Sequence, residues 1–577
     1  MLGYSGRFRP STVWLSKLPT KLVVLALPVL FLFFFLILPL AQIVLLALGF
    51  PDFSLQPILS VLSNDLNLYF AYWNIQQALL SVLFSLVVGL PGAYLLANYD
   101  IPGKVLVRNL LTVPFVLPPI VVLMGFISVF GLGSELNQLW QGLFGVPLVK
   151  LYNSYEAILL AHVFYNIPVI IRVTEVGFRS VDPNLEAIAR SLGASRWRTF
   201  WKVTFPQIFP SLAAACLLVF IYTFNSFAIV LVLGGAQYQT LEVRIYSLAK
   251  VRFDYNAAAA LTVLQVLINV VAIFLYLRYT NRYEVPTGGQ EIRLTRKVFQ
   301  FPVTKRSLAK LTSVVTYFGL VGVVCTLPLV GVAVRSVTSD AGLTLEHYGR
   351  LVDEQLRSFV GLPPTQMLAN SLLFGLAVLG LATFLAVCLN YGLNYETTDR
   401  GSPKLTLRGS LGSTIVILPL CVSSVSMAFA LFSLYRTTFL FDNPAVMVVL
   451  AHTLVAFPFA NRIIAAGRAS MDPSLVNVAR SLGASRLTAF IKVELPLLLS
   501  SIVVAGLFSF AISLGEFGAT SFLSRTDLAT VPVGIYRLLN TRQIEAAAAL
   551  STILVVATVV SFALIERLGK ASVDLKL

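Results

Sequence analysis

The sequence predicts an all-α polytopic membrane protein with about 12 transmembrane helices. Of its 577 residues, 57% are apolar and 12% are charged, so a soluble domain would be left with a large exposed apolar surface. Helices are favoured over strands because lipid offers no partner to an unpaired backbone N–H, and the ten-residue alternation of a barrel is missing. About 20 apolar residues cross a hydrocarbon core of ~30 Å. The charge-free runs of fifteen residues or more are 22–51, 66–99, 109–134, 157–171, 203–241, 255–277, 311–334, 358–395, 409–435, 443–461, 495–515 and 546–565.

Two of the apolar stretches are too short to cross a membrane by themselves. The run 157–171 is the shortest and requires its flanking residues to complete a crossing. The stretch 136–149 has fourteen residues and contains Pro147 and two glycines. We expect it to be an interfacial or re-entrant piece, because proline and glycine interrupt a spanning helix.

The basic residues predict the orientation. If twelve spans alternate from a cytoplasmic amino terminus, the inner segments hold 31 of the 42 Lys and Arg, whereas the acidic residues divide 12 inside and 14 outside. This bias is specific to positive charge. We therefore expect the chain to lie in a bacterial-type plasma membrane with both termini on the cytoplasmic side. The same bias explains the net charge of +16 without nucleic-acid binding. The cysteines lie singly in apolar runs, so neither a disulfide framework nor a metal site is predicted.

An internal repeat divides the chain. A shift of 290 residues aligns 161–206 with 451–496 without a gap and with 21 identities in 46 positions. Six spans per half place both copies on the same side of the membrane, which predicts two parallel six-helix repeats. The predicted segments are a cytoplasmic amino-terminal piece 1–20, a first half 21–280, a basic cytoplasmic linker 281–310 and a second half 311–577.

The octapeptide ARSLGASR occurs in both copies and predicts a helical elbow. An Asp-Pro pair precedes each copy, as at Asp182, and supplies an N-cap followed by proline in the first turn. Gly193 and Gly483 then allow a turn with positive φ between two short helices. The elbows combine basic and apolar residues, which suits either a groove on a soluble partner or the lipid headgroups. Duplication at one topological position favours a two-fold partner.

The elbows resemble the "EAA" loop of ABC importer permeases, G-x9-[IV]-x-[LF]-P, which is matched by Gly193 to Pro206 and by Gly483 to Pro496. Two fused halves resemble the thiamine and ferric-iron importer permeases, with sulfate and molybdate permeases more distant. The second copy has Val476 where the first has Glu186. The resemblance implies ATPase-coupling loops that comprise Glu186, Ala189, Arg190, Gly193, Ala194, Arg196, Lys202 and Pro206, and then Ala479, Arg480, Gly483, Ala484, Arg486, Lys492 and Pro496.

The same resemblance implies partners for the chain. These are two copies of a cytoplasmic ABC ATPase, which bind ATP-Mg, an extracytoplasmic substrate-binding protein, and membrane lipid. The sequence has no GxxxxGK[ST] phosphate loop and no hydrolase motif, so the chain is predicted to be a permease subunit without a cofactor of its own, and not an enzyme.

An ion-gradient-driven secondary transporter is the alternative from another class. Such coupling places ionisable residues within the membrane, where they are costly. The twelve runs contain no Asp, Glu, Lys or Arg, and His162 and His452 are their titratable groups near neutral pH. These histidines are repeat equivalents, and an interhelical hydrogen bond is the commoner role for such a residue.

A possible substrate path follows each elbow helix. Glu516, in SLGEFGA, has Ser226 as its repeat equivalent and suits a cationic substrate, thiamine or ferric iron, better than an oxyanion such as sulfate or molybdate. A salt bridge with Arg525 or Arg537, or a backbone cap, is the alternative role for Glu516. The candidate path residues are Asn225, Ser226, Ser513, Glu516 and Phe517.

Overall fold

The computed structural model describes residues 20–101, 103–280, 296–297, 305–339, 342–393, 395–397, 403–405 and 418–574. The predicted amino-terminal segment and most of the predicted linker lie outside these ranges. Within them, ten helices are long and apolar enough to cross a membrane, or eleven if one bent pair counts as a span. The prediction of an all-α polytopic membrane protein is confirmed.

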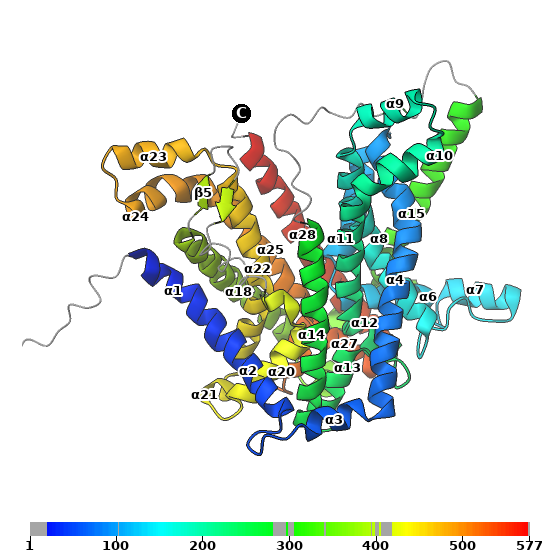
Figure 1. Cartoon of the computed structure of the whole chain (residues 1–577). Coiled ribbons are helices and arrows are strands. Elements are labelled where there is room, and N and C mark those ends of the chain that lie inside the picture. Colours follow the sequence, from blue (N-terminus) through cyan, green and yellow to red (C-terminus); the bar gives the residue numbers. More distant parts are fainter. Residues whose placement is uncertain are drawn as a thin grey trace, which may run out of the picture.

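The first half runs from the left of the molecule to its right in Figure 1 and returns to the centre. Its elements are α1 (Thr20–Leu32), η2 (Phe33–Ile37), α2 (Leu38–Ala47), α3 (Gln56–Leu62), α4 (Asp65–Asn98), α5 (Lys104–Val116), α6 (Pro119–Phe130), α7 (Glu135–Phe144), α8 (Tyr155–Arg179), α9 (Pro183–Ser191), α10 (Arg196–Thr199), η3 (Phe200–Thr204), α11 (Phe205–Phe224), α12 (Ala228–Leu233), α13 (Leu241–Tyr246), η4 (Ser247–Val251) and α14 (Tyr255–Thr280).

The second half repeats this order. Its elements are α15 (Lys305–Val337), α16 (Glu346–Arg350), α17 (Glu354–Val360), α18 (Pro364–Gly392), η5 (Leu418–Cys421), α20 (Ser424–Tyr435), α21 (Phe439–Asp442), α22 (Pro444–Ala469), α23 (Pro473–Ser481), α24 (Arg486–Ala489), η6 (Phe490–Glu494), α25 (Leu495–Gly515), α26 (Gly518–Leu523), α27 (Val531–Asn540) and α28 (Ile544–Asp574). Short pairings join β1 (Tyr99–Asp100) to β2 (Arg296–Lys297), β3 (Thr338–Ser339) to β4 (Gly342–Leu343) and β5 (Tyr395–Thr397) to β6 (Pro403–Leu405).

Two of the predicted spans are not long helices. The run 109–134 is divided into α5 and α6, because Pro118 is extended (ψ 135°) and Pro119 starts a new helix. The hydroxyl of Tyr165 donates to the Leu117 carbonyl at 3.3 Å, which satisfies an acceptor freed by the break. The run 409–435 lies partly outside the described residues, and its described part holds η5 and α20. The stretch 136–149 contains α7, which turns away from α6 by 42° and projects sideways (Figure 1).

The two halves exchange their first helices. Helix α1 packs against α18 of the second half, and α15 packs against α5 and α6 of the first half. Figure 1 shows α1 on the side of α18 and α22, and α15 beside α4 and α6. Each half is therefore completed by a helix from the other, and the predicted halves interlock instead of forming two separate bodies.

Helices α6 and α15 cross where a glycine removes a side chain. A Cβ on Gly125 would lie 2.6 Å from the Pro328 Cβ and would clash with the Pro328 carbonyl oxygen. We expect Gly125→Val to force these helices apart and to destabilise the fold by about 1–3 kcal/mol, the usual cost of overpacking. Thermal unfolding in detergent measures this effect. Gly319→Val on α15 is the control, because a Cβ there has no heavy atom within 4 Å.

Candidate functional site

The first elbow has the geometry that the sequence predicts. Asp182 caps α9 by accepting from the Asn184 amide at 2.8 Å. Helix α9 ends at Ser191, and Gly193, the residue after its C-cap Leu192, has a φ of +85°. The Gly193 N–H donates to the Arg190 carbonyl and the Ala194 N–H to the Ala189 carbonyl, at 3.1 and 3.0 Å, which is a Schellman motif. The turn therefore reverses the chain while its backbone groups stay paired.

The second elbow repeats the first at a distance of 290 residues. Gly483 has a φ of +89°, and its N–H and that of Ala484 donate to the carbonyls of Arg480 and Ala479. Asp472 caps α23, and its hydrogen bonds from Ser474 hold the pKa of that carboxyl below its ordinary value. The elements of the two elbows, α9 to η3 and α23 to η6, have identical lengths.

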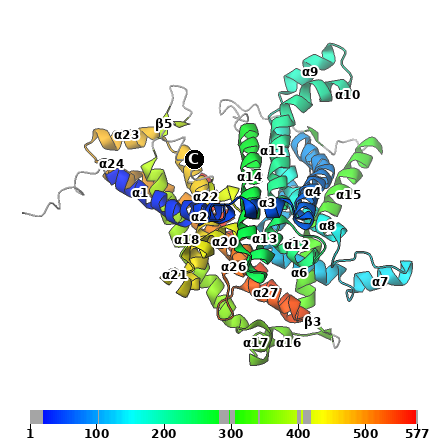
Figure 2. The ribbon, with the colours of Figure 1, turned by 60° about the horizontal axis from the view of Figure 1, so that its bottom comes forward.

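Each elbow presents an exposed apolar face. Leu192 and its repeat equivalent Leu482 are 81% and 82% exposed. The i, i+3, i+7 spacing puts the other members of each face on the same side of α9 or α23. We call these the elbow faces, and they consist of Leu185, Ile188 and Leu192 on α9 and of Leu475, Val478 and Leu482 on α23. Figures 1 and 2 show the two elbows on one side of the molecule and far apart from each other.

The basic candidates surround these faces. Arg190, Arg196 and Lys202 are exposed in the first elbow, as are their repeat equivalents Arg480, Arg486 and Lys492 in the second. Each elbow thus combines exposed leucine with exposed positive charge, which suits either a docking surface for a soluble partner or the lipid headgroups. The partner itself stays a prediction.

A π-helix connects each elbow to a spanning helix. Pro206 has no N–H, so a regular i→i−4 pattern cannot continue through it. The Phe205 N–H instead donates to Phe200 five residues earlier, and Leu495, next to Pro496, does the same to Phe490. Pro206 and Pro496 therefore lie where each elbow joins its spanning helix, α11 or α25. The π-helix keeps the backbone helical across each junction.

The two elbows are attached to the bundle differently. In the first, Thr204 donates to Glu186 Oε1 at 2.6 Å, which ties α9 to the start of α11. In the second, the equivalent of Thr204 is Glu494, and it pairs with Arg468 of α22 at 2.9 Å. Arg486 also lies over the ring of Tyr391 on α18. Val476, which stands where the first elbow has Glu186, cannot make the hydrogen bond to residue 494, and the contacts of Arg468 and Arg486 hold the second elbow instead.

A cavity of about 330 Å³ lies between the halves, at the ends of α11 and α25. Among the described residues, its lining includes four of the five predicted path residues and has no Lys or Arg. Phe227 and Phe517, which are repeat equivalents, stack there with ring centroids 5.5 Å apart and planes 28° apart. A residue can stack on its own equivalent only near the axis that relates the halves, so the cavity lies at that pseudo-two-fold axis.

The predicted path residues have different environments. Asn225 lines the cavity, but its amide oxygen accepts from Gln265 and Asn269, and its NH₂ donates to Ile221 and Asn269, so its hydrogen-bonding capacity is used. Ser513 is absent from the lining and contacts His452 Nδ1 at 2.8 Å. Ser226 lines the cavity and contacts His162 Nε2 at 2.9 Å.

The repeated histidines connect helices. Besides Ser226, His162 contacts Ser81 on α4 at 3.1 Å, and His452 also contacts Thr520 on α26 at 2.7 Å. Both imidazole nitrogens are therefore occupied within the protein in each half. This geometry favours interhelical hydrogen bonding, as the sequence indicates, over a proton relay.

Glu516 lines the cavity and caps a helix. Its Oε1 accepts from the Ala519 amide at 3.0 Å, near the start of α26. The alternative salt bridge is not among the ion pairs of the described residues, since Arg525 and Arg537 donate to the backbone carbonyls of Phe441 and Val360. Of the two alternatives, the backbone cap is the one that this geometry favours.

Sequence reasoning missed Glu242. It lies in α13, between two apolar runs, and is 1% exposed. Its carboxylate lines the same cavity as Glu516, although the two residues are 274 positions apart. Its repeat equivalent is Pro532, so the repeat gave no signal.

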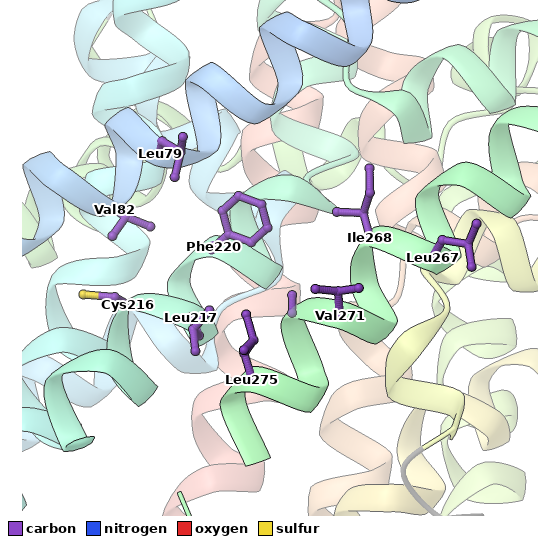
Figure 3. Close-up of a pocket in the computed structure, with 10 residues that line it drawn as sticks. Leu79, Val82, Cys216, Leu217, Phe220, Leu267, Ile268, Val271 and Leu275 are labelled. Carbon is purple, nitrogen blue, oxygen red and sulfur yellow. The ribbon is translucent and has the colours of Figure 1, made fainter. Parts of the chain in front are cut away.

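A second cavity, of about 530 Å³, lies between α4, α11 and α14 (Figure 3). Its lining is apolar throughout and includes Leu79, Leu267 and Val271, which are more than half exposed. This groove lies on the outer surface of the helix bundle, on helices that are long and apolar enough to cross a membrane. It offers no polar group to orient a substrate, and the inter-half cavity is the candidate for the path.

The comparisons agree with this architecture. The sequence signature of the family described as "Binding-protein-dependent transport system inner membrane component" matches residues 89–285 and 406–572, one match in each half. The thiamine transport system permease protein ThiP of Brucella abortus (strain 2308) is 26% identical over 490 residues, 84% of each chain. That of Escherichia coli (strain K12) is 25% identical over 508 residues, 86% of this chain and 88% of that one.

Two further similarities extend the comparison. The putative ferric transport system permease protein FbpB 1 of Haemophilus influenzae is 27% identical over 426 residues, 72% of this chain and 63% of that one. A bacterial ABC transporter involved in the import of the acidic polysaccharide alginate aligns with a TM-score of 0.37 and 18% identity, over 46% of this chain and 96% of that chain. The spanning helices make this a multi-pass inner membrane protein. The chain therefore belongs to the family of binding-protein-dependent transport system inner membrane components.

Proposed function

We propose that this chain alone forms the membrane pathway of an ATP-driven importer. Two copies of a cytoplasmic ABC ATPase dock on the elbow faces, and an extracytoplasmic binding protein delivers substrate on the opposite side, where α3 and α21 lie (Figure 1). Both termini are then cytoplasmic. ATP-Mg binds to the partner, and this chain acts as a permease without a cofactor.

One observation carries this proposal. Two apolar faces that differ only in Ile188 against Val478, 290 residues apart and on the same side of the molecule, are exposed to nearly the same degree. A dimeric motor requires two such surfaces, whereas an ion-gradient transporter has no use for them. Both ring nitrogens of His162 and of His452 also contact side-chain hydroxyls within the protein, which does not favour a proton relay through these residues.

The helices that follow the elbows supply a mechanism. Helix α11 runs from the first elbow to Asn225, and α25 runs from the second to Glu516, and both of these residues line the inter-half cavity. When ATP binding draws the two ATPase subunits together, each elbow moves its own spanning helix as a rigid rod. The stacked rings of Phe227 and Phe517 then separate or close about the axis, which gives alternating access.

The cavity favours a cationic substrate. Among the described residues, two acidic side chains and no Lys or Arg line it, so an oxyanion such as sulfate or molybdate would find no positive charge to compensate its own. Thiamine and ferric iron, named for the relatives, are both cations, and the ThiP relatives match more of this chain. Thiamine is the substrate that we propose first.

Changing the elbow glycines tests the coupling role. We expect Gly193→Val and Gly483→Val to weaken ATPase association and substrate-stimulated hydrolysis, because a β-branched residue with positive φ costs about 1–3 kcal/mol of backbone strain. No heavy atom lies within 4 Å of a Cβ at either site, so the strain would act without a clash. The measurements are co-purification of the ATPase and its hydrolysis rate in proteoliposomes.

The matched control is Gly145→Val. Gly145 has a φ of +74° and equally open surroundings, but it ends α7. Normal association and hydrolysis in both elbow variants would exclude the elbows as the coupling sites.

A further inference from the structure

Glu242 is a buried carboxylate with one unpaired oxygen. Its Oε1 accepts from the Val425 amide of the second half at 3.3 Å. Its Oε2 is buried and accepts no hydrogen bond within 3.5 Å from the described residues, and the Ser423 side chain is a polar neighbour of the carboxyl group. A buried carboxylate normally fills its acceptor positions or pairs with a cation, since its desolvation is otherwise uncompensated.

The nearby basic residues are engaged elsewhere. Arg244, on the same helix, donates to Asn67 Oδ1 at 2.9 Å and lies over the ring of Phe70. Lys250 donates to the carbonyls of Phe522 and Ser524 at 2.6 and 3.2 Å. Among the described residues, no ion pair involves Glu242, so none of them supplies a positive charge to its carboxylate.

The cavity in front of Glu242 has aromatic walls. Phe227, Phe517, Tyr165 and Tyr222 line it, and the carboxylate of Glu516 lines it as well. Aromatic faces attract a cation whose charge is spread over a large, weakly hydrated group, and they provide stacking area for a ring.

A metal ion fits these walls poorly. A bare multivalent ion needs several oxygen, nitrogen or sulfur ligands converging on one point. In the part of the chain that the structure describes, no group of three or more His, Cys, Asp or Glu residues is placed to hold one. Two carboxylates amid phenyl rings suit a monovalent organic cation instead.

We propose that Glu242, together with Glu516 and the Phe227–Phe517 pair, forms a binding site for an organic cation, with an aromatic ring or a quaternary nitrogen, inside the permease. This inference rests on the importer function proposed above and adds that the permease itself selects its substrate. Glu242 supplies the charge, and the stacked rings supply the face on which the cation lies. Val425 ties the carboxylate to the second half, so the site is complete only where the two halves meet.

Binding to the purified full-length chain in nanodiscs tests the site. The probes are thiamine, tetramethylammonium and ferric citrate, and the variant is Glu242→Gln, which keeps an acceptor for the Val425 amide. We expect thiamine to bind to the unmodified chain and its affinity to fall by roughly 30-fold or more in the variant, because a buried charge pair loses one partner. Glu346→Gln, an exposed carboxylate paired with Arg350, is the control and should bind as the unmodified chain does.

Further variants separate the possible outcomes. Glu242→Asp should recover part of the affinity, and Phe517→Leu should weaken thiamine more than tetramethylammonium, whose binding needs no ring stacking. Three outcomes would overturn the site. The first is that Glu242→Gln binds thiamine as tightly as the unmodified chain does, and the second is that the unmodified chain binds neither thiamine nor tetramethylammonium. The third is that only ferric ion binds in a way that depends on Glu242. ATPase co-purification is measured on the same samples, so that a failed importer function, which removes ATPase binding, is distinguished from a failed cation site, which leaves it intact.

Discussion

Replacing Leu192 and Leu482 together by Asp is expected to abolish ATPase association and reduce substrate uptake to background. Both leucines are more than four-fifths exposed in the free chain, so the change should not disturb its fold. In a complex, each would be the most exposed anchor of its elbow face, and truncating an anchor residue costs about 2 kcal/mol or more. A carboxylate adds a buried charge with no partner, so the effect of Asp exceeds that of Ala.

The measurements are co-purification of the ATPase and ATP-dependent uptake in proteoliposomes, with each single variant beside the double one. A single variant should retain one docked ATPase and lose most of the uptake, because both halves have to move together. Leu343→Asp is the matched control, since Leu343 is 86% exposed but lies in β4, away from the elbows. If the double variant still co-purified with a full complement of ATPase, the elbow faces would not be the docking surface.

The elbows were predictable because their signals are local. An Asp cap, a proline in the first turn, a central glycine and a serine cap all lie within about fourteen residues, and each acts on backbone groups close by in the sequence. Repetition at 290 residues then made the pattern conspicuous. Hydrophobic run length likewise predicted the ten long spans, because lipid imposes the same requirement on every crossing segment.

The features that the sequence did not reveal depend on contacts between distant segments. The exchange of first helices relies on Gly125 meeting Pro328, and neither residue differs in type from many others in apolar runs. Glu242 lies in a short segment between runs, and its partner Val425 is 183 positions away. The cavity was therefore only partly predicted: Glu516 was recognised as an acidic residue directly after an apolar run, whereas the second carboxylate needed the fold.

An ion pair between Arg468 and Glu494 holds the second elbow against the helix bundle. Arg468 pairs with Glu494 at 2.9 Å and also donates to the Asn390 carbonyl, so it joins α22, η6 and α18 at one point. Both side chains are largely buried. We expect Arg468→Ala to destabilise the chain by about 3–5 kcal/mol, because it leaves the Glu494 charge buried without its partner. Thermal unfolding in detergent measures this loss, and substrate-stimulated hydrolysis should fall with it.

The first half of the chain provides the control. Its residues at the positions equivalent to Arg468 and Glu494 are Phe178 and Thr204, and Phe178 packs there in an apolar cluster. The double variant Arg468→Phe with Glu494→Thr installs that uncharged pair and should recover most of the stability, since replacing both members of a buried pair by well-packed residues is often neutral. If Arg468→Ala were as stable as the unmodified chain, the ion pair would contribute nothing to the stability of the fold. If the double variant were no more stable than Arg468→Ala, the second elbow would depend on the charges themselves. The contacts that hold the first elbow could then not replace those that hold the second.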